Sequence, residues 1–409
     1  MKSFANSNSI DELRVIARRK LPRAVFDFVD GAAEAEVTLA SNRSDLAAMR
    51  FVPRYPVDVG ERNLATRLFD RDVALPLFIA PTGLAALVWP KADIELARAA
   101  GAFGIPFTIS MSSSVRLEDI AAAATATQLW FQMYLYRDRK IVRSVLDRCK
   151  AVGIATLVVT VDVPVLGNRR RDHTNRFSVP LRPTLRMAFD AVRCLPWSLG
   201  MIGQGVPRMQ NLVDYGSGKD LASLQDLTNR IMDASVTWEG LGWLRDNWQG
   251  KLIIKGILAA EDAIEAQRRG FDAVIVSNHG GRQLDGAVSS IAALQEIRTA
   301  LGGKFPLLMD GGIRSGADLA KTVAAGAVAA GVGRATLFGA AAAGEAGVRH
   351  ALTLLRQEFD RALALLGCRA TAELDSRFLA PAAAASIARH RRPAPSYRDA
   401  ARDPATSGA

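Results

Sequence analysis

The sequence predicts an α/β protein built as a (β/α)8 barrel, and three observations support this fold class. First, eight short, continuously apolar runs rich in β-branched residues are bounded by turn residues, as expected of buried parallel strands. Second, most gaps between them carry apolar residues at helical spacing, so strands and helices alternate. Third, nearly every run ends in hydrogen-bonding side chains. The expected strands are 75–80, 106–110, 129–135, 155–161, 251–255, 273–276, 306–309 and 329–332.

Helices are expected before and between these strands. An N-terminal pair should fill 9–29, with a break at Leu21-Pro22 because proline interrupts a helix. A doubly wound sheet is the alternative architecture, but Gly331-Val332-Gly333-Arg334 lacks the third glycine and the downstream acid of a dinucleotide-binding fingerprint. The helical patterns between the strands lie at 91–100, 142–152, 261–269 and 291–301.

Length and composition agree with one large domain. The chain has 409 residues, 49% of them hydrophobic, enough for a substantial core. We expect one barrel domain over 1–385 and a disordered tail, rich in Ala, Arg and Pro, over 386–409. The polar start indicates no secretory signal, so a cytoplasmic location is expected. The apolar stretch 322–344 is mostly Ala and Gly and contains Arg334, so no membrane-spanning helix is expected.

The formal net charge of +11 indicates anionic partners. Nucleic acid is not expected, because aromatic residues are few and no nucleic-acid motif is present. A membrane surface or small anionic ligands remain as explanations. A metal site is not expected either, because the three cysteines lack ligand spacing. They are Cys149, Cys194 and Cys368.

The connection after the fourth strand is much longer than one helix requires, and such long loops are often functional. Within its segment 177–215, apolar Leu185, Phe189 and Val192 share one helical face, and Arg186, Asp190 and Arg193 share another. A basic amphipathic helix followed by Trp197 and further apolar residues can lie in a membrane interface. A lid or a subunit contact is the alternative. The excess basic charge favours an anionic membrane, which would place the protein peripherally on the inner face of the cell membrane.

The segment 277–286, Ser-Asn-His-Gly-Gly-Arg-Gln-Leu-Asp-Gly, follows an apolar strand and presents His279 and Arg282 about one turn apart. Histidine can accept a proton near neutral pH, and the arginine fork matches a carboxylate. The pair suits an acid substrate that must lose a proton. An isolated His-x-x-Arg would more often be a structural histidine beside a surface charge, so the motif needs support from the rest of the chain.

That support comes from motif order. The chain resembles the FMN-dependent 2-hydroxy acid dehydrogenases and oxidases, over the whole barrel, and among them the bacterial mandelate and lactate dehydrogenases with their basic insertion after strand four. The motifs that carry this resemblance are 80–83 (Ala-Pro-Thr-Gly), 131–134 (Phe-Gln-Met-Tyr), 160–164 (Thr-Val-Asp-Val-Pro), 254–256 (Ile-Lys-Gly), 277–283 and 310–314 (Asp-Gly-Gly-Ile-Arg).

The resemblance implies FMN as cofactor and a set of roles at the substrate. His279 would accept the substrate proton while two electrons go to the flavin, by carbanion formation or hydride transfer. Asp162 would orient His279 and stabilise its imidazolium. Arg282 and Arg169 would bind the substrate carboxylate, and Tyr134 would hydrogen-bond the substrate oxygen. From the residues alone, Asp162 could instead cap a turn, Arg169 could be a surface charge and Tyr134 could be core packing.

The resemblance also assigns the cofactor site. Lys255 would place its ammonium beside the edge of the flavin where negative charge accumulates on reduction. The polar edge of the ring would be met by Thr160, Gln132 and Ser110, and the phosphate would be held at the ends of strands seven and eight. The further cofactor residues are Ala80, Pro81, Thr82 and Gly83 on the N5 side, and Ser277, Asp310, Gly311, Gly312, Arg314, Gly333 and Arg334.

At two positions the residue type bears on the substrate and on the electron acceptor, and the resemblance also implies an oligomeric state. Phe28 stands where the family has a tyrosine whose hydroxyl meets the substrate carboxylate, which implies a bulkier or more apolar substrate, or binding weaker by about 1 kcal/mol. Gly83 stands where oxidases of the family usually carry alanine, which favours a dehydrogenase that passes electrons to a quinone-type acceptor rather than to oxygen. The resemblance further implies a homo-oligomer, a tetramer.

Overall fold

The structure, a computed structural model, is that of the predicted barrel. It describes residues 3–177, 189–190, 192–205, 207–215 and 233–381, so the tail expected at 386–409 lies outside it. Eight parallel strands form a closed ring in chain order, and the last strand pairs with the first. The strands are β3 (Leu77–Ile79), β4 (Phe107–Ser110), β5 (Leu129–Met133), β6 (Thr156–Thr160), β7 (Lys251–Ile257), β8 (Ala273–Val276), β9 (Leu307–Asp310) and β10 (Ala329–Val332).

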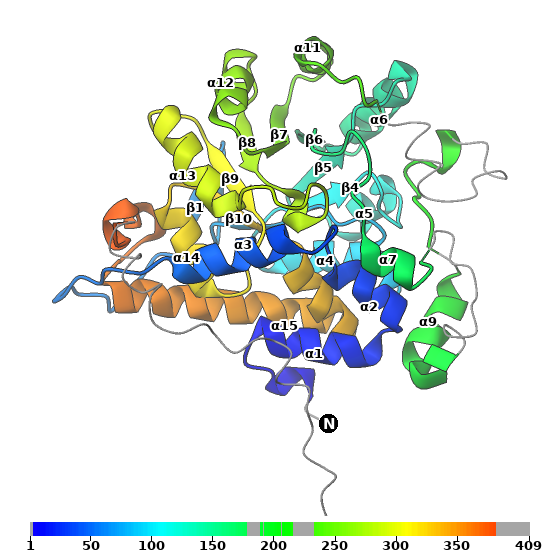
Figure 1. The fold of residues 1–409 in the computed structure, drawn as a ribbon, viewed down its shortest axis with the longest axis horizontal. Coiled ribbons are helices and arrows are strands. Elements are labelled where there is room, and N and C mark those ends of the chain that lie inside the picture. Colours follow the sequence, from blue (N-terminus) through cyan, green and yellow to red (C-terminus); the bar gives the residue numbers. More distant parts are fainter. Residues whose placement is uncertain (1–2, 178–188, 191, 206, 216–232, 382–409) are drawn as a thin grey trace, which may run out of the picture.

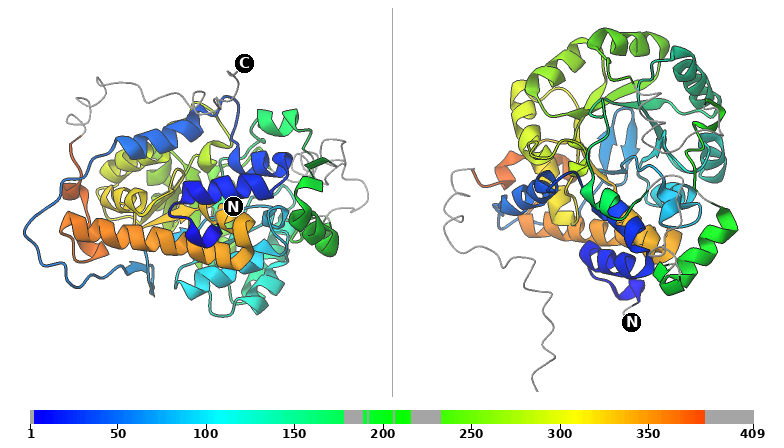
Figure 2. Two further views of the ribbon diagram at one scale, coloured as in Figure 1. Left: turned by 90° about the horizontal axis from the view of Figure 1, so that it is seen from below. Right: turned by 45° about the vertical axis from the view of Figure 1, so that its right-hand side comes forward.

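Helices surround the ring, as the right-hand view of Figure 2 shows. The four helices predicted between strands are present within a few residues of their expected bounds, because their apolar faces pack on the outside of the strands. The surrounding helices are α4 (Ala92–Ala102), α5 (Leu117–Ala123), α6 (Arg139–Ala151), α11 (Trp238–Asn247), α12 (Ala260–Arg268), α13 (Ser290–Ala300), α14 (Gly316–Ala324) and α15 (Arg334–Leu366).

The predicted N-terminal pair is α1 (Ile10–Lys20) and α2 (Arg23–Asp30), separated at Leu21-Pro22. Helix α1 begins after Ser9, whose hydroxyl accepts a hydrogen bond from the Glu12 amide. It lies along α15, and α2 follows toward the barrel (Figure 1). A third helix, α3 (Val37–Ala48), was not predicted, because its apolar residues show little helical periodicity.

A short hairpin packs against the inside of the barrel. It is formed by β1 (Thr66–Leu68) and β2 (Arg71–Val73), was also not predicted, and contributes Leu68 and Val73 to the cluster inside the barrel.

Strand β7 differs from the prediction at its carboxyl end. It runs two residues past its predicted end at Lys255, and its register with β8 shifts between Lys255 and Ile257. The intervening Gly256 has φ 103°, a conformation that side chains disfavour, so glycine permits this irregularity.

The insertion after β6 contains α7 (Arg170–Thr174), α9 (Leu195–Gln204) and the short turn Val213–Tyr215. Residues 185–188 and 191 of the expected amphipathic helix lie outside the described part of the chain. Phe189 and Val192 are exposed, whereas Asp190, expected on the other face of that helix, is buried. Asp190 is buried because its carboxylate accepts a hydrogen bond from the amide of Arg23, where α2 begins.

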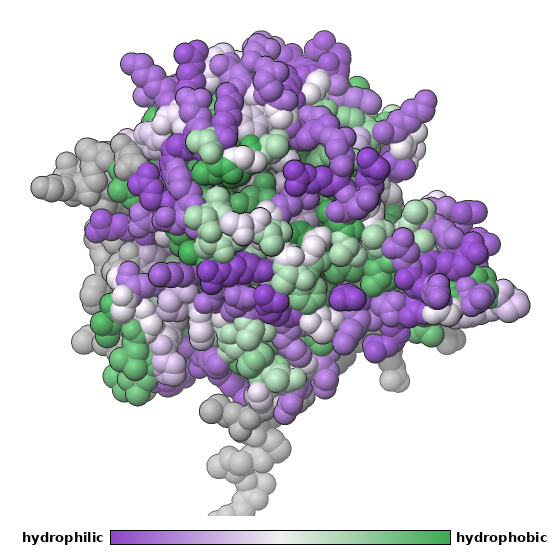
Figure 3. All heavy atoms as spheres, turned by 180° about the vertical axis from the view of Figure 1, so that it is seen from behind, coloured by the Kyte–Doolittle hydropathy of each residue, from purple (hydrophilic) through white to green (hydrophobic). Residues whose placement is uncertain are grey.

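Helix α9 docks on the loop that follows β3. Trp197 Nε1 donates to the carbonyl of Leu87 at 2.7 Å, and Gln204 Nε2 donates to that of Ala86 at 3.0 Å. Its other side is exposed and apolar, a patch that Figure 3 shows at the lower left. Within the described residues, no helix is both long and apolar enough to span a bilayer.

Candidate active site

A cavity of about 210 Å³ opens at the carboxyl ends of the strands. Each of the eight strand ends contributes to its wall, as expected for a barrel of this type. All predicted site residues line it except Asp162 and Ser277, which lie directly behind lining residues. The predicted residues in the wall are Phe28, Ala80, Pro81, Thr82, Gly83, Ser110, Gln132, Tyr134, Thr160, Arg169, Lys255, His279, Arg282, Asp310, Gly311, Gly312, Arg314, Gly333 and Arg334.

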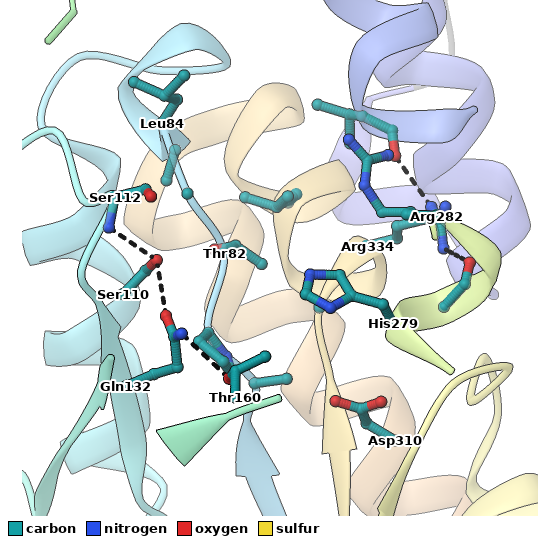
Figure 4. A pocket seen from close by; sticks show the side chains of 18 of the residues that line it. Thr82, Leu84, Ser110, Ser112, Gln132, Thr160, His279, Arg282, Asp310 and Arg334 are labelled. Atoms are coloured by element: carbon teal, nitrogen blue, oxygen red, sulfur yellow. Dashed lines mark hydrogen bonds between the residues drawn. The ribbon is translucent and has the colours of Figure 1, made fainter. Parts of the chain in front are cut away.

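His279 points into the cavity (Figure 4). The carboxylate of Asp162 holds its ring from behind. Its Nδ1 lies 3.0 Å from Oδ1 and 3.2 Å from Oδ2 of the carboxylate. Burial alone would raise the pKa of the Asp162 carboxyl, but the charges of His279 and Lys255 hold it below its ordinary value. The carboxylate is therefore ionised at neutral pH and can stabilise a protonated imidazole.

The backbone at His279 is unusual and holds the ring in place. His279 has φ 57°, and the two glycines after it also have positive φ. A Cβ atom on Gly280 would lie 2.8 Å from Arg334 Nη1, and one on Gly281 would lie 2.6 Å from the amide nitrogen of Leu39. Left-handed backbone conformations of non-glycine residues occur often at functional sites. The Gly-Gly pair lets the loop turn tightly against α3 and the first residue of α15.

Arg282 is anchored by the end of α2. Its Nη1 donates to the carbonyls of Phe28 and Gly31 at 2.8 Å each, groups that have no partner inside the helix. Burial, with the charges of Arg169 and Arg334, lowers the pKa of Arg282 well below its usual range. An anion in the cavity would relieve this destabilisation.

Phe28 lies beneath the two arginines predicted to bind a carboxylate. The guanidinium carbon of Arg282 is 5.2 Å from its ring centroid and that of Arg169 is 5.8 Å away. Phe177 stacks against the same ring at a centroid distance of 4.6 Å. Both guanidinium groups therefore make cation–π contacts with one aromatic ring. Phe177 was not predicted, since nothing local in the sequence pairs it with Phe28.

Lys255 is buried, and its ammonium is paired with one hydroxyl and one carboxylate. Its Nζ donates to Ser277 Oγ at 2.9 Å and lies 3.3 Å from Asp310 Oδ2, while Ser277 Oγ donates to Asp310. Because an unpaired buried ammonium is costly, this pairing explains how the lysine is tolerated at the end of an apolar strand. It also explains why Ser277 lies behind the wall rather than in it.

The opposite wall carries a row of neutral polar groups. Ser110 Oγ donates to Gln132 Oε1 at 3.3 Å, and Gln132 Nε2 donates to Thr160 Oγ1 at 3.0 Å (Figure 4). The three residues end neighbouring strands, which is why they meet. Beside them, a Cβ atom on Gly83 would lie only 2.9 Å from Ser112 Cβ, so glycine permits this close approach.

The ends of β9 and β10 are basic and rich in glycine. Gly311 and Gly312 have φ 104° and 91°, which exposes their amides in a turn. Burial lowers the pKa of Arg314 to about 9 and that of Arg334 to about 10. Among the described residues no carboxylate forms an ion pair with either guanidinium. Two half-buried guanidinium groups that form no ion pair with a described carboxylate can bind an anionic group such as a phosphate.

Several wall residues were not predicted. Most are apolar: three follow β3, two follow β6, two lie in the insertion, and the others lie in α2, after β5 and in α15. One signal was present in the sequence, the apolar residues directly after the 80–83 motif. The residues of the insertion gave no such signal. They lie far along the chain from every strand-end motif, so the sequence does not indicate that they reach the cavity. The unpredicted apolar residues are Val29, Leu84, Ala85, Val88, Tyr136, Val163, Leu166, Met209, Leu212 and Leu337.

Comparison with known proteins identifies the family of this chain. The model of the FMN-dependent dehydrogenase family matches residues 17–381. The chain is 41% identical to (S)-mandelate dehydrogenase of Pseudomonas putida, over 91% of this chain and 94% of that protein, and 42% identical to L-lactate dehydrogenase of Caulobacter vibrioides, over 91% and 97%.

Solved structures give the same result. The crystal structure of the monotopic membrane protein (S)-mandelate dehydrogenase is similar with a TM-score of 0.87 at 41% identity, covering 92% of this chain and 99% of that one. A mandelate oxidase bound to (S)-4-hydroxymandelic acid is similar with a TM-score of 0.80 at 36% identity, covering 91% and 98%. With a family model that spans most of its length, the chain belongs to the FMN-dependent dehydrogenase family.

Proposed function

We propose that this protein oxidises an L-2-hydroxy acid, lactate-like or mandelate-like, to the 2-oxo acid. One observation carries the proposal: a histidine backed by an ionised carboxylate faces the same cavity as two half-buried arginines. The relatives named mandelate and lactate dehydrogenase support the substrate class. The reaction removes two electrons and two protons from the hydroxy acid, and it requires both a base and an anchor for the carboxylate.

The side chains divide these tasks. Arg282 and Arg169 would bind the carboxylate and so fix the α-carbon relative to His279. His279 would take one proton at Nε2, because Nδ1 is engaged by Asp162. Tyr134 lies in the same wall, and burial together with the charge of Asp162 raises its pKa, so its hydroxyl stays protonated and can donate to the substrate oxygen.

The cavity fits FMN. Arg314 and Arg334 are half-buried and form no ion pair with a described carboxylate, and they would hold the phosphate together with the amides of Gly311 and Gly312. Ser110, Gln132 and Thr160 would meet the polar edge of the ring, and Lys255 would compensate negative charge on it. FMN, when bound, supplies the two-electron acceptor for the reaction.

A quinone-type acceptor is the proposed destination of the electrons. Gly83 supports a dehydrogenase, since the resemblance associates alanine at this position with oxidases. An oxygen-using oxidase is the second candidate, because a mandelate oxidase is among the similar structures. Hydrogen peroxide released during aerobic turnover would identify the oxidase, and oxidation by a quinone without peroxide would identify the dehydrogenase.

We also propose that the exposed side of α9 and the residues before it bind a membrane surface. Phe189, Val192, Leu195, Leu199 and Ile202 are 57–79% exposed, which favours a partner outside the chain over a lid packed on it. The similar mandelate dehydrogenase is described as monotopic. Flotation with liposomes containing anionic lipid, for the full chain and for a variant lacking 177–215, tests this. Binding by the shortened variant would refute it.

The central experiment is anaerobic mixing of the purified flavoprotein with a panel of L-2-hydroxy acids while the flavin absorbance is recorded. Bleaching by lactate or mandelate is expected. Absence of bleaching by every hydroxy acid would favour a barrel that binds FMN or another phosphate ligand without redox chemistry. Light scattering of the same sample tests the expected homo-oligomer, for which a tetramer is the prediction.

A further inference from the structure

Gln283 belongs to the 277–283 motif, yet none of the roles above uses it. Its carboxamide forms three hydrogen bonds, all to the main chain of the loop after β6. Nε2 donates to the carbonyls of Asp162 at 3.1 Å and Val165 at 3.0 Å, and Oε1 accepts from the amide of Gly167 at 3.3 Å. A carboxamide offers two N–H donors and one carbonyl acceptor, the set that these three groups need.

The two segments also touch directly. A Cβ atom on Gly167 would lie 2.3 Å from the carbonyl oxygen of Arg282 and 2.7 Å from that of Gln283. Only glycine permits this approach of one backbone to another. The Gln283 side chain therefore bridges two segments of the backbone that are already in contact. Little conformational freedom remains for the loop between residues 162 and 167.

That loop carries functional groups at both ends, Asp162 at the start and Arg169 just beyond its end. At Asp162, the carbonyl is held by Gln283 while the carboxylate is held against His279. We propose that Gln283 is a positioning residue that fixes Asp162 against His279 for proton transfer. This inference rests on the proposed function, because it assigns Gln283 a share in orienting the proposed base.

The expected kinetic effect depends on the groups that Gln283 does not hold. Arg282 is anchored by the carbonyls of Phe28 and Gly31, and Arg169 pairs with Asp172 of α7, so the affinity for the substrate carboxylate depends little on Gln283. A misplaced Asp162 would instead affect the proton-transfer step. Gln283→Met should lower kcat by about 10–100-fold and change KM by less than about threefold, because reactions of positioned groups are sensitive to displacements near 1 Å.

Gln283→Glu provides a sharper variant. Glutamate keeps the length and the acceptor, but it has no N–H groups and would place a carboxylate against the carbonyls of Asp162 and Val165. Its kcat should be lower than that of Gln283→Met. Asn168→Ala is the matched control on the same loop, because its side chain makes an exposed hydrogen bond to Glu34 and none to Gln283. This control should keep kcat within about twofold.

A double-mutant cycle in the holoenzyme separates positioning from a general structural role. Rates of flavin reduction by the best hydroxy acid are compared for wild type, Gln283→Met, Asp162→Asn and the double variant. If Gln283 acts through Asp162, its replacement should cost less than about twofold once Asp162 is asparagine. An equal loss in both backgrounds, or no loss in the wild-type background, would overturn the proposal.

Hydrogen exchange measured by mass spectrometry provides a readout that does not need turnover. Exchange over 162–169 should rise in Gln283→Met relative to wild type and to Asn168→Ala, because the Gly167 amide loses its acceptor. Unchanged exchange would overturn the role of Gln283 in holding the loop. If wild type is reduced by no hydroxy acid, the proposed function fails and with it the assignment to proton transfer, whereas the exchange result still decides whether the loop is held.

Discussion

Nδ1 of His279 lies 3.0 Å from Oδ1 of Asp162, although 117 residues separate them and strand β7 stands between β6 and β8 in the barrel. The contact is made across Gly256 of β7, where a Cβ atom would lie 2.6 Å from Cβ of Asp162. The absence of a side chain at this one position lets the carboxylate reach the imidazole. Three neighbouring strands therefore bring this pair together. Proton transfer from the substrate would depend on the distance between the carboxylate and the imidazole.

Replacing His279 by glutamine should abolish turnover and retain the flavin. Glutamine keeps much of the size but cannot accept a proton near neutral pH, so the rate of flavin reduction should fall by about 10²–10⁴-fold. Anaerobic stopped-flow absorbance measures this rate, and the ratio of flavin to protein absorbance checks retention. An unchanged rate would remove His279 from its proposed role.

Lys255→Met should slow flavin reduction or weaken flavin retention, by about 10–100-fold, because it removes a buried positive charge from the site. The change also leaves Asp310 buried without its partner. Adding Asp310→Asn should recover thermal stability but not the reduction rate, which separates the two effects. Full activity of Lys255→Met would count against the placement of the lysine beside the flavin.

Arg314→Met should affect the apoprotein and the holoprotein in opposite directions. Burial lowers the pKa of Arg314 to about 9 because the charged form is destabilised there, so methionine should raise the Tm of the apoprotein by about 1–3 °C. It should also raise the Kd for FMN by about 10–100-fold, since a charge-assisted contact is lost.

Thermal melts and fluorescence titration of FMN measure these two effects. Arg314→Lys, which keeps the charge, should lie between wild type and Arg314→Met in affinity. An unchanged Kd in Arg314→Met would exclude Arg314 from the phosphate site.

Phe28→Tyr should tighten the binding of small hydroxy acids. The new hydroxyl would lie near Arg282 and Arg169, where it can donate to the substrate carboxylate, so KM for lactate should fall about fivefold, equivalent to about 1 kcal/mol. Phe177→Tyr is the control, because it adds a hydroxyl to the same stacked pair outside the cavity wall. If Phe28→Tyr leaves KM unchanged, the argument about substrate size is wrong.

Leu199→Ser with Ile202→Ser should weaken membrane binding without affecting chemistry. These side chains are 66% and 79% exposed, and removing two apolar groups from a membrane contact should reduce partitioning more than tenfold. Leu365→Ser is a matched control, because that leucine is 60% exposed near the far end of α15. Liposome flotation measures the binding, and reduction of a soluble dye measures turnover. Equal binding by both variants would contradict the assignment of α9.

The strand ends show how far local pattern is informative. Apolar runs such as 273–276 form buried strands in this structure, because their side chains must leave water. Parallel strands of one barrel direct their carboxyl ends to one face, so polar residues at successive run ends were expected to converge. Gln132, Thr160 and Lys255 do lie in one cavity for this reason.

By itself, therefore, the sequence determined the fold class, the eight barrel strands and most of the polar residues around the cavity. Only the tertiary structure decided which of them touch: Asp162 with His279 across Gly256, Gln283 with the loop after β6, and Asp190 inward against α2. The physical reason is that burial acts on each segment through its own composition, whereas a hydrogen bond between distant segments depends on backbone approaches that no local periodicity encodes.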